Sequence, residues 1–307
     1  MSIYGTLKEI GNHLAKKQQV IVDTVTEKAP ILDIIPFAPA THGLWHVYEE
    51  VDEIQGAAFV PINSPLPDVD TVNNLKKIDL DIIGGQAFVP EDTALQMGGK
   101  EKYFAKKLPK IQLQSGMDCE KRLYYGNFIR YAIANGTAKD AGGTGNETAS
   151  IVAIRFEREA TGGLYNPESW KANGMLNVQP YYGGALTVIP TGHKYAGAPG
   201  YGLRLKGSLG MQISDPRTCA AILNITPTNI PTRAMIDDLL ADVRATPGDT
   251  KLFMHVKTKN LLNQFKQDSM HMRPDDKMIS FSWMDWDGIP VVTSYNLLPF
   301  GETATSL

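Results

Sequence analysis

Cysteine, net charge and long apolar runs are all scarce in this sequence. Only two cysteines, Cys119 and Cys219, occur among 307 residues, which excludes the disulfide framework of a small secreted protein. No apolar run approaches the ~18 residues of a transmembrane helix, and no basic segment followed by an apolar one opens the chain. The net charge is only −3, which argues against a dedicated nucleic-acid-binding protein. We expect a soluble intracellular protein with a sizeable core.

Motifs for catalysis and metal binding are also missing. There is no Gly-x-x-x-x-Gly-Lys-Ser/Thr loop for a triphosphate and no Gly-x-Ser-x-Gly turn for a nucleophilic serine. Residues 143–145 match only part of a dinucleotide-binding loop. His42 and His46 are four residues apart, but in the expected strand that separation spans about 13 Å, too far to share one ion. We therefore predict no enzyme activity, no cofactor and no metal site.

The first 40 residues are predicted to form an N-terminal arm. Its apolar run lies between Pro30 and Pro36, which confine it to extended or turn geometry. These side chains need cover, either from the chain's own domain or from another subunit, and the sequence leaves both open. The candidates for a subunit interface in the arm are Ile31, Leu32, Ile35 and Phe37.

Residues 41–90 are predicted to form a long β-ribbon. Residues 77–82 alternate polar and apolar side chains strictly, which is the pattern of a strand with one solvated face. A strand of about 9 residues spans roughly 30 Å, so the ribbon could project well beyond a compact body. The interface candidates on the ribbon are Trp45, Tyr48, Phe59, Ile78 and Leu80.

Residues 91–135 are predicted to be the longest helical region, softened at the glycines of residues 98–99 and kinked at Pro109. Between residues 94 and 130, eight basic residues outnumber three acidic ones, which gives a local charge of +5. Two interpretations of this charge are open. The helix face is simply solvated, or it forms a surface that contacts a polyanion. The DNA-facing candidates are Lys102, Lys106, Lys107 and Lys110.

The rest of the chain mixes strands and helices, which predicts an α+β fold. Strands are expected at residues 151–156, 220–225 and 252–256, and residues 183–210 form a Gly-rich stretch with short strand fragments. A helix is expected from Pro231 or Thr232 to Ala245. Asp287-Gly288 lies between β-rich segments at residues 279–283 and 289–292, which predicts two strands and a closing hairpin.

This order of elements resembles the major capsid proteins of tailed bacteriophages, whose Hong Kong 97-type fold is shared with encapsulins. The likeness covers nearly the whole chain. It rests on residues 29–32 and 35–37 in the arm, 56–63 and 81–85 in the ribbon, 122–127 at the end of the helix, and 221–225, 237–240, 251–254 and 286–290 in the later elements.

The resemblance implies a division into capsid domains. Residues 1–40 would be the N-terminal arm, residues 41–90 the extended loop, residues 91–180 with 276–307 the peripheral domain containing a long spine helix, and residues 181–275 the axial domain. The chain would form pentamers and hexamers of an icosahedral shell around double-stranded phage DNA, in a virion assembled in the host cytoplasm.

The resemblance also implies partners. Because only about 40 residues precede the extended loop, we expect a separate scaffolding protein, together with a portal, a decoration protein, non-specific contacts to packaged DNA and no membrane. Two alternatives remain open at this stage. One is an encapsulin-type shell that encloses protein cargo. The other is a soluble β-rich enzyme with its site in the Gly-rich insert at residues 183–210.

Overall fold

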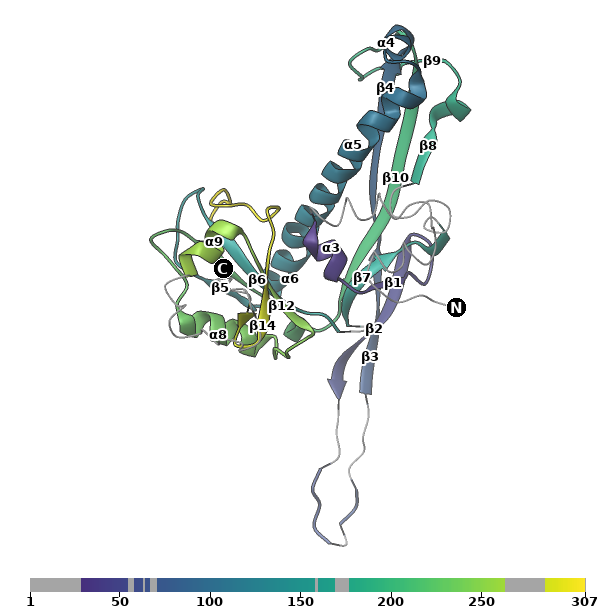
Figure 1. The fold of residues 1–307 in the computed structure, drawn as a ribbon. Coiled ribbons are helices and arrows are strands. Elements are labelled where there is room, and N and C mark those ends of the chain that lie inside the picture. The colour runs from purple at the N-terminus through teal and green to yellow at the C-terminus, as the bar shows by residue number, and fades with distance from the viewer. Residues whose placement is uncertain are drawn as a thin grey trace, which may run out of the picture.

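The chain folds into two lobes and a projecting hairpin (Figure 1). The computed structural model describes residues 29–54, 58–62, 64–66, 71–157, 160–168, 177–262 and 285–306. In the elongated lobe, the long helix α5 (Lys100–Arg122) lies along a six-stranded sheet. The compact lobe contains a second six-stranded sheet. The hairpin, made of β2 (Trp45–Ile54) and β3 (Thr71–Asp79), extends downward in Figure 1, away from both lobes. The predicted α+β class is confirmed.

The sheet of the elongated lobe is built on one long strand. Strand β10 (Pro199–Ile213) runs antiparallel to β4 (Asp81–Pro90), from Gly200 opposite Pro90 to Leu209 opposite Asp81. The other strands are β1 (Phe37–Pro39), β7 (Thr161–Tyr165), β8 (Asn177–Pro180) and β9 (Thr187–Val188). The main path of the sheet is β1-β7-β10-β4, and β8 and β9 also pair with β10.

This sheet corrects two predictions. The ribbon was expected to reach residue 90, but it ends at Asp79: Leu80 is buried, and the next strand pairs with β10 instead of β2. The Gly-rich stretch was expected to be mostly loops, yet residues 199–210 belong to β10. A Cβ atom at Gly202 would lie 2.5 Å from the ring of Phe88, so this glycine lets the ring pack directly on the strand. The glycines here therefore allow close packing in a regular strand.

The predicted long helical region is present and is broken at the predicted glycines, and Pro109, where a kink was predicted, lies inside one unbroken helix. A short helix, α4 (Glu91–Gln96), ends before Gly98 and Gly99, whose positive φ angles of 82° and 109° break the helix. Helix α5 follows with Pro109 inside it, and it continues into a π-helical segment (Leu123–Phe128) and α6 (Ile129–Ala134). We call the continuous stretch from α5 to α6 the spine.

The sheet of the compact lobe is buried on both faces. Its order is β13 (Asp285–Trp286), β14 (Ile289–Thr293), β12 (Thr250–Met254), β6 (Ala149–Arg155), β11 (Cys219–Ile225) and β5 (Ala138–Asp140). Along β6, Val152 and Ile154 join the core that contains the spine, and Ile151 and Ala153 join the core on the opposite face. This two-sided burial explains why these strands read as nearly continuous apolar runs.

Helix α8 (Arg233–Asp242) is the helix predicted after residue 231, and the structure places it over the second face of this sheet. The side chain of Thr232 caps it by accepting a hydrogen bond from the backbone N–H of Met235 at 3.3 Å. Its buried apolar positions recur every three or four residues and pack in the core with β6 and β11; they are Ile236, Leu239, Leu240 and Val243. A shorter helix, α9 (Val256–Leu261), follows β12.

Sheet membership divides the chain differently from the expected domain boundaries. Strand β6, placed by prediction in the peripheral domain, pairs with β11 and β12 of the expected axial domain. Strand β10, placed in the axial domain, pairs with β4 in the elongated lobe. The predicted turn at Asp287-Gly288 is confirmed by positive φ angles of 46° and 84°. The expected strand at 279–283 and residues 1–28 of the arm lie outside the described residues.

Candidate functional site

The tip of the β2–β3 hairpin presents apolar side chains to solvent. The relative exposure is 110% for Phe59, 94% for Ile62 and 80% for Leu66. The strands below the tip pair from Trp45 opposite Asp79 to Ile54 opposite Thr71. Several exposed apolar side chains on one projecting loop are typical of a protein–protein contact. Burying three such side chains is worth about 1.5–3 kcal/mol each, so the tip offers a strong attachment point.

The base of the hairpin is fixed by aromatic and polar contacts. The rings of His42 and Trp45 stack with their centroids 3.7 Å apart, and Lys77 Nζ lies 5.3 Å from the centroid of Trp45. The hydroxyl of Thr41 lies 2.8 Å from His46 Nδ1, which also accepts the Thr41 backbone N–H. Partial burial lowers the pKa of His46. The two histidines thus serve as packing and capping groups at the hairpin base.

The five ribbon candidates therefore differ in accessibility. Phe59 is fully exposed, whereas Trp45, Tyr48 and Ile78 are half-buried in this chain. Leu80 is buried, with 6% of its surface exposed, so it is a core residue and its assignment to an interface is wrong.

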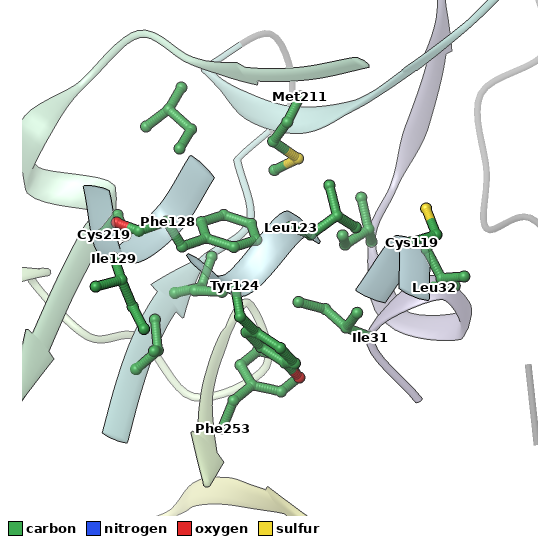
Figure 2. Close-up of a cluster of buried hydrophobic side chains, with 14 of the residues drawn as sticks. Ile31, Leu32, Cys119, Leu123, Tyr124, Phe128, Ile129, Met211, Cys219 and Phe253 are labelled. Atoms are coloured by element: carbon green, nitrogen blue, oxygen red, sulfur yellow. Dashed lines mark hydrogen bonds between the residues drawn. The ribbon is translucent and has the colours of Figure 1, made fainter. Parts of the chain in front are cut away.

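The arm candidates belong to the chain's own core. Helix α3 (Pro30–Ile34) packs beside the spine, and Figure 2 shows Ile31 and Leu32 in one cluster with Leu123 and Tyr124. Ile31, Leu32 and Ile35 are fully buried and Phe37 is 2% exposed. Their proposed role as interface residues is wrong, because the spine and the strands around it already cover these side chains.

The candidate lysines all lie at the exposed surface of α5. Lys102, Lys106 and Lys110 are spaced by four residues and so form one stripe along the helix. Lys107 differs, because its ammonium donates a hydrogen bond to the hydroxyl of Tyr103 and lies 4.4 Å from the centroid of that ring. None of the salt bridges between described residues involves these four lysines.

Two carboxyl groups that the sequence analysis did not identify lie next to the spine, Glu120 fully buried and Glu302 half-buried. Glu302 accepts hydrogen bonds from the hydroxyl of Tyr125 at 2.5 Å and from the hydroxyl of Ser150. Glu120 is fully buried and accepts a hydrogen bond from the amide of Asn296. Burial raises the pKa of both carboxyl groups, and the hydrogen bonds that they accept oppose this shift. Each ties the C-terminal segment to the spine.

A cavity of about 660 Å³ beside the spine contains this Glu302 cluster. It lies between the end of α5 and the segment around Leu298 to Thr305, and Arg122 on its rim is paired with Asp81 at 3.3 Å. Two hydroxyl groups hold the carboxylate of Glu302, so the arrangement is that of a structural link.

A second, smaller pocket of about 260 Å³ lies partly in the Gly-rich insert, where the enzyme alternative placed its site. Its lining contains His193 and two lysines but no serine, cysteine or carboxylate. It therefore lacks both the nucleophile and the orienting acid of a hydrolytic triad.

The cysteines and the search for ligand clusters give no chemical site. Both thiols are buried, and burial raises the pKa of Cys119 to about 12 and that of Cys219 higher still. Thiols of this kind are poor nucleophiles. Within the part of the chain that the structure describes, no three histidine, cysteine or acidic side chains are grouped to hold a metal ion. None of the described helices is both long and apolar enough to cross a membrane.

Comparison with known proteins gives matches in structure alone. No protein-family model and no curated protein sequence matches the chain. A structure of bacteriophage epsilon15 aligns with a TM-score of 0.56 and 15% identity, over 89% of this chain and 88% of the phage chain. The capsid of bacteriophage JBD30 aligns with a TM-score of 0.53 and 9% identity, over 85% and 88%. The JBD30 capsid decorated with minor capsid protein trimers gives 0.50 and 10%, over 86% and 89%.

These alignments cover both lobes and most of each phage chain, and at such low identity they establish the fold alone. The chain therefore has the Hong Kong 97-type fold of tailed-bacteriophage capsid proteins.

Proposed function

We propose that this chain is a major capsid protein and not an enzyme, and that it forms the pentamers and hexamers of an icosahedral shell around double-stranded phage DNA. The observation that carries the proposal is the apolar hairpin tip on a capsid fold. Contacts that pass from one copy to the next close into rings, and rings of five and six tile a curved shell.

In this proposal the hairpin tip docks on a neighbouring copy. Phe59, Ile62 and Leu66 together would contribute about 4–9 kcal/mol of apolar burial for each contact, before the cost of association. The contact is repeated around each ring, so a modest energy for each copy suffices for a stable shell. The hairpin points away from both lobes, where a neighbouring copy would meet it (Figure 1).

The two lobes take the remaining structural roles. The elongated lobe would be the peripheral domain, and the compact lobe would be the axial domain that meets its copies at the centres of the rings. Assembly in the host cytoplasm would use a separate scaffolding protein and a portal, and a decoration protein would bind the finished shell. The JBD30 capsid is one relative in fold that carries minor capsid protein trimers.

The lysine stripe would contact packaged DNA without sequence preference. Replacing Lys102, Lys106 and Lys110 with glutamine should reduce the slope of log K against log salt by roughly 2–3, since each phosphate contact contributes about 0.9. Binding of the purified chain to a random-sequence DNA duplex at several salt concentrations measures this slope, and a variant with Lys257→Gln, at an exposed position on α9 of the compact lobe, is the control. An unchanged slope in the triple variant would show that these lysines do not contact DNA.

The hairpin tests the proposed assembly directly. Because Ile54 and Thr71 are paired partners, residues 55–70 can be replaced by an Asn-Gly turn that joins the two strands in register. The shortened protein should keep its circular dichroism spectrum but form no shells when produced with its scaffold. A variant with Leu95→Ser, which changes an exposed apolar residue outside the hairpin, should still assemble. Closed shells from the shortened protein would contradict the proposal.

A further inference from the structure

The 260 Å³ pocket lies at the free end of the elongated lobe. It is formed where the first turns of α5, the end of β4 and the loop after β9 meet, near α4 in the upper part of Figure 1. Neither the hairpin nor the compact lobe reaches this end of the molecule, so the pocket stays accessible in the single chain. Its lining residues are Phe88, Tyr103, Lys107, Ile189, His193, Lys194 and Tyr195.

The apolar part of the pocket is rigid. The ring of Phe88 lies on Gly202, where a Cβ atom would be 2.5 Å away, and it meets the ring of His193 edge-on at 4.6 Å. Ile189 is 1% exposed and Tyr103 is 8% exposed, so both side chains are held by their surroundings. A pocket whose walls are already packed loses little entropy when a ligand enters.

The polar part of the pocket contains donors and no acidic group. The Tyr103 hydroxyl accepts a hydrogen bond from Lys107, which leaves its own proton free to donate to a ligand. Lys194 Nζ lies 5.4 Å from the centroid of Tyr195, and neither lysine forms a salt bridge with any described residue. No carboxylate lines the pocket. Two ammonium groups and a phenol beside an apolar floor favour an anion attached to an apolar body.

We propose that this pocket binds a carboxylate side chain of a second protein, presented on an acidic segment next to an apolar residue. A volume of about 260 Å³ is small for a cofactor or drug-sized ligand and suits one anchoring side chain of a protein partner. The carboxylate would accept hydrogen bonds from Lys107, Lys194 and Tyr103, and the neighbouring apolar group would rest on Phe88 and Ile189. The inference does not depend on shell assembly, because it concerns a pocket complete within one chain.

Fluorescence anisotropy of the full-length chain tests this inference. The probes are two fluorescein-labelled peptides, Gly-Ser-Glu-Leu-Glu-Ser-Gly and its counterpart with glutamine in place of both glutamates. The acidic peptide should bind about tenfold more tightly than the glutamine peptide, since charge-assisted hydrogen bonds are roughly twice as strong as neutral ones. Equal binding of the two peptides, or no binding of either, would overturn the proposal.

Variants assign the binding to this pocket. Lys107→Met with Lys194→Met should weaken binding of the acidic peptide by about tenfold or more, and Tyr103→Phe should weaken it severalfold while it keeps the ring in place. Lys206→Met, at an exposed position on β10 of the same lobe and outside the pocket, is the control and should bind normally. A thermal melt confirms that each variant is folded.

A decathymidine oligonucleotide completes the test, because a nucleic acid could present the same negative charge. If it binds more tightly than the acidic peptide and the loss of Lys107 and Lys194 abolishes its binding, the pocket is a nucleic-acid site and the proposal is wrong. Displacement of the peptide by free N-acetylglutamate, with no displacement by the oligonucleotide at equal charge concentration, supports it.

Discussion

Glu120 offers a sharp test of how the lobes are held together. This carboxyl group on the spine is fully buried, and its Oε2 accepts a hydrogen bond from the amide of Asn296 in the C-terminal segment. None of the salt bridges between described residues involves Glu120, so its charge has no ionic partner there. Burial raises the pKa of Glu120 above its usual value of 4.5, although hydrogen bonds from Asn296, Ser294, Tyr124 and the Ile31 backbone oppose the shift.

The substitution Glu120→Ala should lower the free energy of unfolding by about 2–4 kcal/mol. The Asn296 amide would lose its acceptor, which costs about 1–3 kcal/mol for a buried donor. The missing side chain would leave a cavity worth about 1 kcal/mol more. Glu120→Gln, which keeps the shape and one oxygen acceptor, should cost less than about 1 kcal/mol at acidic pH. Urea unfolding of the unassembled protein measures both values.

The pH dependence of the free energy of unfolding distinguishes the cost of burying the ionised carboxyl group from the cost of lost packing. Because the pKa is higher in the folded state, the folded protein binds more protons than the unfolded chain at pH values above 4.5. The stabilising contribution is therefore complete below pH 4.5 and is lost as the pH rises through the folded-state pKa. Glu120→Gln should remove this loss, so its stability relative to the parent should improve between pH 4.5 and 8. A constant difference over that range, or an alanine variant within about 0.5 kcal/mol of the parent, would refute the reasoning.

Two further substitutions test local packing. Gly163→Ala would place a Cβ atom 2.3 Å from the ring of Phe37, so we expect a loss of about 1–3 kcal/mol in urea unfolding; Gly85→Ala, where the added atom meets nothing within 4 Å, is the control, and equal losses would contradict this packing. Thr232→Ala should cost about 1 kcal/mol by removing the N-cap of α8, whereas Thr232→Ser should cost only a few tenths; a melting temperature unchanged by the alanine would show that the cap is unimportant.

The elements best predicted from sequence are those whose signals are local. Helix α8 begins within two residues of its prediction, because a capping threonine and a 3.6-residue apolar repeat mark it. The compact-lobe strands were predicted from their apolar runs, which follow from burial on both faces. The turn at Asp287-Gly288 likewise depends only on the two residues that form it.

The elements predicted poorly depend on distant partners. Strand β10 is rich in glycine because Phe88 and Val89, more than a hundred residues earlier, pack against it, and the sequence gives no local sign of this. The change of pairing at Leu80 is equally hidden, because the alternating pattern continues through it. The arm residues around Ile31 show that an apolar run needs cover but not which surface provides it.

The candidate sites also differ in whether local sequence patterns or distant contacts define them. The exposed Phe59 and the lysine stripe follow from sequence, because a projecting ribbon and a charged helix face are local patterns. The carboxylate pocket joins three segments, represented by Phe88, Lys107 and Lys194, which only the fold brings together. The buried Glu120 gave no signal either, because one glutamate in a basic helix reads as a surface residue.

The central claim is that this chain assembles through its hairpin into a closed shell. Negative-stain electron microscopy of the purified protein, alone and produced together with its scaffold, tests it most directly. The account predicts closed particles or rings of five and six subunits. A uniform 33.7 kDa monomer under every one of these conditions would contradict it.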